Sequence, residues 1–163
     1  MILRLICATL ALALSAPAVP QTHIAIPVDS VARAKFRHDD PALVDKLAFI
    51  NAFVNAAIEP MSDSDHYGLL DYWVSLPPDA KGDCEDYAAS KFVLIEGLNG
   101  QPINPIAQMK LVGVMLDRGR GGHAILAIRL PSGAVMYLDN LQGEPMTRKE
   151  LKARGYAFFD WKA

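Results

Sequence analysis

Cysteine is scarce in this chain, because only Cys7 and Cys84 occur among its 163 residues. Cys7 lies in an apolar run that follows Arg4 and precedes Ser15-Ala16-Pro17-Ala18. A short basic start, an apolar core and a small-x-small end are typical of a secretory signal peptide. We therefore interpret residues 1–18 as a leader that is cleaved after Ala18. Its removal leaves Cys84 without a partner for an intrachain disulfide.

Long apolar runs and blocks of like charge are also missing. The apolar run of the leader is too short to span a bilayer, and no later stretch is long enough, so we expect no membrane insertion after the leader is removed. The 16 basic and 18 acidic side chains leave a small negative net charge, and no basic block predicts binding to nucleic acid. Residues 19–163 are enough for one exported domain with a single core.

What the sequence does contain is an unusual setting for its second cysteine, Gly82-Asp83-Cys84-Glu85-Asp86-Tyr87. Pro77-Pro78 predicts a loop before it, and apolar residues at helical spacing predict a helix that ends between residues 97 and 100. Cys84 then lies in the first turn, where free backbone N–H groups and the helix dipole favour a thiolate. Because the thiolate is the reactive form of cysteine, Cys84 is a candidate nucleophile.

The acidic residues around Cys84 disfavour its thiolate form. Asp83, Glu85 and Asp86 suit a helix N-terminus, but their charges repel a thiolate and raise the pKa of the thiol. A hard divalent cation held by some of these oxygens would reverse the local field, so we predict a calcium ion here. The alternative is that Cys84 is a small buried apolar residue and that the acids only cap a helix.

A second acidic segment lies upstream. Residues 61–68 are polar and turn-like, and Asp63 and Asp65 alternate so that they offer oxygen ligands to a cation, although such runs are often solvated turns. His66 in the same segment is a second candidate base. Residues 69–76 form a short apolar segment that leads to the prolines before Cys84.

The rest of the chain indicates one α+β domain. Residues 19–39 read as an extended lead-in with His23 and His38 on its surface. Asp40-Pro41 opens a helix that Pro60 ends. Apolar residues recur along this helix at helical spacing, and two phenylalanines widen its apolar face: Leu43, Leu47, Ile50, Val54, Ile58, Phe49 and Phe53.

Strands are predicted at residues 110–117, 123–130 and 134–139, and the short turns between them indicate an antiparallel meander. Thr147 and Glu150 form a capping box for a helix that ends at Arg154, and residues 156–161 form a last strand. We expect the Cys84 helix and the N-terminal helices to pack on this antiparallel sheet.

The predicted meander contains two further candidate catalytic residues. His123 opens one strand and Asp139 closes the next, and neighbouring antiparallel strands can place these ends together. Packing Cys84 across the sheet then completes a Cys-His-Asp triad, in which Cys84 attacks an acyl carbon, His123 transfers protons and Asp139 orients the imidazole. Backbone N–H groups at the helix start could bind the oxyanion. The alternatives are a core histidine at 123 and a turn acid at 139.

Four segments resemble the bacterial transglutaminase-like cysteine peptidases, which include the LapG-type periplasmic proteases that release biofilm adhesins. They are Asp71-Tyr72-Trp73, Gly82-Asp83-Cys84-Glu85-Asp86-Tyr87-Ala88, Gly122-His123-Ala124 and Leu138-Asp139-Asn140-Leu141. The resemblance runs from about Asp40 to the C-terminus. It implies a papain-like or transglutaminase-like fold, a periplasmic location and a triad of Cys84, His123 and Asp139.

The resemblance also implies calcium bound by acids that match Asp83 and Glu85, with Asp63 as a matching upstream acid. In LapG-type members the substrate is an outer-membrane-anchored adhesin, cut near its N-terminus at paired alanines, and an inner-membrane cyclic-di-GMP receptor sequesters the protease. This chain departs from that pattern in its shorter length, in residues 74–78 and in brief glycine-rich loops before His123. The surfaces that meet an adhesin or a receptor are not matched residue by residue.

Three functions follow as hypotheses. The first is a calcium-dependent cysteine endopeptidase that cuts a protein substrate. The second is acyl transfer to an amine or deamidation of glutamine, because the same thioester intermediate can be resolved by an amine or by water. The third is a non-catalytic module that binds calcium or a protein partner on the same fold.

Overall fold

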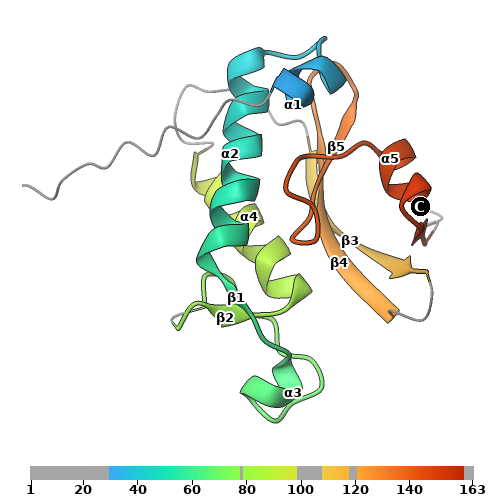
Figure 1. The fold of residues 1–163 in the computed structure, drawn as a ribbon. Helices are drawn as coiled ribbons and strands as arrows, with labels where there is room; N and C mark the ends of the chain where they lie inside the picture. Colours follow the sequence, from blue (N-terminus) through green and yellow to red (C-terminus); the bar gives the residue numbers. More distant parts are fainter. Residues whose placement is uncertain (1–29, 78, 99–107, 118–120, 160–163) are drawn as a thin grey trace, which may run out of the picture.

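The structure is a computed structural model that describes residues 30–77, 79–98, 108–117 and 121–159. The predicted leader 1–18 and His23 lie outside the described residues. Three helices, α1 (Ser30–Lys35), α2 (Pro41–Ala57) and α4 (Cys84–Leu98), lie on one side of a sheet, and α5 (Arg148–Ala153) lies on the other (Figure 1). None of the described helices has the length and apolarity needed to span a bilayer.

The sheet is the predicted antiparallel meander with one added strand. Its order is β5-β4-β3-β6, and every neighbouring pair is antiparallel. The strands are β3 (Gln108–Leu116), β4 (Gly121–Arg129), β5 (Val135–Leu138) and β6 (Tyr156–Phe158). Side chains alternate between the faces, so one face of β4 packs on α4 and the other packs toward α5. The predicted α+β class is confirmed.

Helix α2 begins as the sequence predicts but ends earlier. The side chain of Asp40 accepts a hydrogen bond from the Ala42 N–H, and Pro41 opens the helix. The helix ends at Ala57, before Pro60, because Glu59–Pro60 forms a short strand β1 that pairs in parallel with β2 (Lys81–Gly82). This pairing joins the end of α2 to the segment just before α4.

Two expectations for the N-terminal part are wrong. The lead-in is not extended throughout, because Ser30–Lys35 is helical and brings the buried side chains of Ala32 and Phe36 into the core. The apolar face of α2 is narrower than predicted, since Phe49 and Phe53 are exposed and stack on each other instead of entering the core. His38 is exposed, as expected.

Lys91 on α4 is an unexpected member of the core. It is completely buried, and within the described part of the chain its ammonium group has no hydrogen-bond partner. The Nζ atom lies 6.0 Å from the centre of the Tyr87 ring. Burial lowers the pKa of Lys91 to about 7, and the nearby charge of Asp139 opposes the shift. Lys91 is therefore poorly solvated when it is charged.

The buried amine of Lys91 should make the free energy of unfolding depend on pH. The folded pKa lies near 7 and that of an unfolded lysine near 10. Between these values the unfolded chain holds a proton that the folded chain lacks, so Lys91 makes the free energy of unfolding rise with pH. The variant Lys91→Met lacks this contribution. We expect this variant to be more stable than wild type at pH 7. The difference in the free energy of unfolding should shrink by up to about 1.4 kcal/mol for each pH unit toward pH 10, because only wild type gains stability as the pH rises.

The measurement is urea unfolding of both proteins at several pH values from 7 to 10. Lys149→Met is the matched control, because Lys149 is exposed on α5 and its loss should leave the pH dependence as in wild type. A constant difference between Lys91→Met and wild type across this range would contradict the prediction.

Candidate active site

The start of α4 places Cys84 against strand β4. Helix α4 begins at Cys84, as predicted, and the thiol is partly buried and free of any disulfide. The backbone N–H of Ala124 lies close enough to the sulfur to oppose the rise in the pKa of the thiol, so the thiol lies beside the residue that follows His123. The thiol itself donates to Glu85 Oε2 at 3.0 Å.

His123 and Asp139 meet directly, as predicted from the meander. His123 Nε2 lies 2.7 Å from Asp139 Oδ1, and both side chains are buried. Asp139 also accepts hydrogen bonds from the Leu141 N–H at 2.9 Å and from the Tyr156 hydroxyl at 2.7 Å. Burial raises the pKa of Asp139, but these hydrogen bonds and the nearby His123 outweigh it and the net shift is downward. The pair leaves Nδ1 of the imidazole for a second partner.

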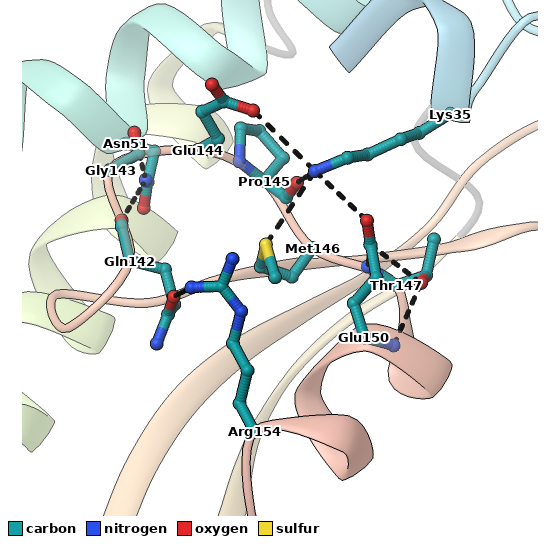
Figure 2. Close-up of polar contacts among 10 residues, drawn as sticks. All are labelled: Lys35, Asn51, Gln142, Gly143, Glu144, Pro145, Met146, Thr147, Glu150 and Arg154. Atoms are coloured by element: carbon teal, nitrogen blue, oxygen red, sulfur yellow. Dashed lines mark hydrogen bonds and ion pairs between the residues drawn. The ribbon is translucent and has the colours of Figure 1, made fainter. Parts of the chain in front are cut away.

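The loop that carries Asp139 is held by side chains that the sequence did not single out. Asn55 on α2 donates to the Asp139 carbonyl at 3.0 Å, and Asn51 donates to the Gln142 carbonyl at 3.0 Å. On the other side, Arg154 donates to the Gln142 side chain, and Lys35 reaches from α1 to the Pro145 carbonyl (Figure 2). The loop is thereby tied to α1, α2 and the end of α5, which fixes the carboxylate beside His123.

Cys84 is the member of the predicted triad that lacks a direct hydrogen bond to the other two among the described contacts. Burial raises the pKa of its thiol to about 12, the hydrogen bond to Glu85 and the charges of Glu85 and Asp83 add to the rise, and the Ala124 N–H opposes it. The thiol is therefore protonated at neutral pH and is held by Glu85. The sequence predicted the direction of this shift, and the structure adds burial as its largest cause.

Five carboxylates gather around the start of α4. Oxygens of Asp63, Asp83 and Asp86 lie within 4.8 Å of one another, and so do those of Asp63, Asp71 and Glu85. Asp63 belongs to both groups and is 2% exposed. In the described part of the chain, no lysine or arginine forms an ion pair with any of the five. We call these five residues the acidic cluster.

The acidic cluster is short of hydrogen-bond donors. The buried Oδ1 atoms of Asp63 and Asp83 have no partner among the described residues. Burial raises the pKa of Glu85 to about 7, and the neighbouring carboxylate of Asp83 adds to the rise. Buried carboxylate oxygens without donors are costly, and a set of hard oxygens is what calcium binds. The residues present therefore fit a calcium ion.

The predicted metal residues Asp63, Asp83 and Glu85 all lie in this cluster. Asp86 was among the acids from which the sequence predicted that a cation takes its ligands, whereas the sequence did not link Asp71 to a metal. Asp65, the other upstream candidate, is exposed and bonded to Ser62 instead. The reason is that residues 63–66 form a helix, α3 (Asp63–His66), and not a turn. Residues two apart on a helix do not face the same side.

His66, the second candidate base, does not join the site in the described contacts. Its ring lies 2.6 Å from Asp79 Oδ2 and stacks on Tyr67 at 3.9 Å. A histidine held in this way is a structural partner of Asp79, and His123 remains the candidate base.

The acidic cluster also fixes the backbone around it. The Tyr72 N–H donates to Asp63, and the Val74 N–H donates to Asp86 Oδ1 at 2.7 Å. Gly82 lies so close to the Asp86 carboxylate that a Cβ atom at this position would overlap it. The carboxylates therefore hold the segment before β2 against the start of α4.

Comparisons with known proteins agree with this architecture. A family model of bacterial transglutaminase-like cysteine proteinases matches residues 27–161. Calcium-bound LapG of Legionella pneumophila is 23% identical with a TM-score of 0.51, over 64% of this chain and 57% of LapG. EGTA-treated LapG of the same organism is 23% identical with a TM-score of 0.53, over 69% and 59%. A further LapG structure is 22% identical with a TM-score of 0.54, over 72% and 65%.

A comparison with curated proteins gave no match. The chain covers 57% to 65% of the length of the LapG structures. At this identity the likeness establishes the fold, and the expected transglutaminase-like fold is confirmed. Because the family model covers most of the sequence, this chain belongs to the bacterial transglutaminase-like cysteine proteinases.

Proposed function

We propose that this protein is a calcium-dependent cysteine endopeptidase that cuts a protein substrate. The observation that carries the proposal is the buried His123–Asp139 pair, with 2.7 Å between Nε2 and Oδ1, beside a free cysteine at a helix start. Family membership supports the reaction class. His123 can also supply the proton that the leaving amine of a peptide needs.

Cys84, His123 and Asp139 each have a distinct role in the proposed reaction. His123 Nδ1 takes the proton of Cys84, and the sulfur attacks the carbonyl carbon to form a tetrahedral intermediate. The backbone N–H groups at the start of α4 face the developing oxyanion. His123 returns the proton to the leaving amine, and water then hydrolyses the thioester. Asp139, kept ionised by Leu141 and Tyr156, stabilises the imidazolium form of His123.

The acidic cluster is the proposed calcium site. Asp63, Asp83 and Glu85, together with Asp71 and Asp86, would hold the ion, and its charge would offset the carboxylates that raise the pKa of the Cys84 thiol. The Glu85 oxygen that accepts the hydrogen bond of the thiol could not also serve as a metal ligand, so a bound ion would release the thiol from Glu85. The calcium-bound and EGTA-treated forms of LapG support this assignment.

The setting we propose is the periplasm, reached through the leader that the sequence predicts. By likeness to LapG-type members, the proposed substrate is an outer-membrane-anchored adhesin, and the proposed regulator is an inner-membrane cyclic-di-GMP receptor. Both rest on the resemblance of Cys84, His123 and Asp139 and their neighbours to that group.

Removing any member of the triad should abolish cleavage. We expect Cys84→Ala, His123→Ala and Asp139→Ala each to lower the rate by at least about 100-fold, because they remove the nucleophile, the base and the group that orients it. The measurement is mass spectrometry of protein fragments released by cells that express each variant, with circular dichroism to confirm folding. His66→Ala is the matched control, because it removes another carboxylate-bonded histidine outside the site.

Two outcomes would point to the other hypotheses. Full cellular activity of folded Cys84→Ala would mean a non-catalytic binding module. Incorporation of a labelled amine into glutamine side chains without chain cleavage would mean acyl transfer.

Calcium should stabilise the folded protein. An ion that binds only the folded chain adds about 2.7 kcal/mol at a hundred times its dissociation constant, which corresponds to a rise of several degrees in Tm. We expect Asp63→Asn to remove this response and to raise Tm in EDTA, because it keeps an oxygen for the Tyr72 N–H and relieves charge repulsion. The measurement is thermal unfolding with EDTA, calcium or magnesium.

Asp65→Asn is the matched control, since Asp65 lies on the same short helix but outside the acidic cluster. It should respond to calcium as wild type does. Equal Tm values for wild type in EDTA and in calcium would contradict the assignment of the ion.

A further inference from the structure

Residues 69–76, which we call the apolar loop, expose most of their large apolar side chains. Leu70 is fully exposed, and the others are about half exposed. The exposed members are Leu69, Leu70, Tyr72, Trp73 and Leu76. Single exposed apolar residues are common, but five within eight residues make a patch of the kind that binds other molecules.

The apolar loop is held in place by its backbone. The Tyr72 N–H is bonded to Asp63, the Val74 N–H to Asp86 Oδ1 at 2.7 Å, and the Leu76 N–H to Ser90 Oγ at 2.7 Å. Trp73 Nε1 also donates to Asp71 within the loop at 2.7 Å. A surface that is fixed before a ligand arrives costs little conformational entropy on binding.

The apolar loop lies next to the thiol. The carboxylate of Asp71 in the loop has an oxygen within 4.8 Å of one in Glu85, and Glu85 Oε2 is 3.0 Å from the sulfur of Cys84. Figure 1 shows the segment between α3 and β2 at the same end of the molecule as the start of α4. A polypeptide that presents a carbonyl carbon to Cys84 therefore passes within reach of the loop.

We propose that the apolar loop binds apolar side chains of the protein substrate next to the bond that is cut. The inference deepens the proposed function and rests on it. It commits to a substrate segment that is apolar and not acidic, because the loop offers aliphatic and aromatic side chains and the neighbouring acidic cluster repels carboxylates. Leu70 and Trp73, which are the most exposed, provide the contact.

The test uses two neutral peptides of equal length with the same chloroacetyl group, one containing Leu and Phe and the other Ser and Gln. With calcium present, we expect the apolar peptide to alkylate Cys84 of wild type at least tenfold faster than the polar peptide. Leu70→Ser and Trp73→Ser should each reduce this ratio to below threefold. Phe53→Ser is the matched control, because Phe53 is similarly exposed on α2 and its loss should leave the ratio unchanged.

Iodoacetamide, which is too small to contact the loop, separates the possible failures. Equal rates for the two peptides in wild type, with normal alkylation of Cys84 by iodoacetamide, would overturn this inference and leave the proposed function standing. Equal rates together with dimers that Leu70→Ser dissociates would show that the loop joins two copies of the chain. No alkylation of Cys84 by iodoacetamide would count against the nucleophile itself and thus against the proposed function.

Discussion

The buried carboxylates at the start of α4 are the feature on which the candidate site depends. They come from three segments, which are α3, the apolar loop and residues 83–86 at the start of α4, and they meet with few donors between them. Backbone N–H groups of Tyr72 and Val74 satisfy two of their oxygens and in doing so fix the loop. The same carboxylates add to the effect of burial on the pKa of Cys84, because Glu85 accepts a hydrogen bond from its thiol. Structure and reactivity thus depend on one electrostatic balance.

The two halves of the site are built differently. On the sheet side, Asp139 accepts hydrogen bonds from His123, Leu141 and Tyr156, and Asn55 holds its backbone carbonyl. The Asp139 carboxylate therefore has its hydrogen-bond donors within the protein, and these contacts hold it beside the imidazole. On the helix side, the charges are not balanced by the protein, and the thiol is protonated and bound to Glu85. Activation therefore has to act on the helix side, where a change of charge alters the pKa of the nucleophile.

Local sequence signals predicted much of this fold and site. The features that depend on neighbouring residues are the helix start at Cys84, the capping box of Thr147 and Glu150, and the strands that place His123 and the loop of Asp139. What could not be predicted depends on contacts between distant segments. Asn55 looks like an ordinary helix residue until the loop after β5 packs on it. The same holds for Asp71 in the acidic cluster, for the burial of Lys91 and for the exposure of Phe49 and Phe53, since periodicity does not reveal what covers a helix face.

The connection between the acidic cluster and the apolar loop has a thermodynamic consequence. Asp63 and Asp86 are bonded to the loop backbone, so a cation held by these carboxylates and a peptide held by the loop act on the same segment. Linkage is reciprocal, so a cation that fixes the loop for a peptide must itself bind more tightly when the peptide is present. An ion at this site would then do more than offset the charges near the sulfur. It would couple the ionisation of Cys84 to the binding of the chain that Cys84 attacks.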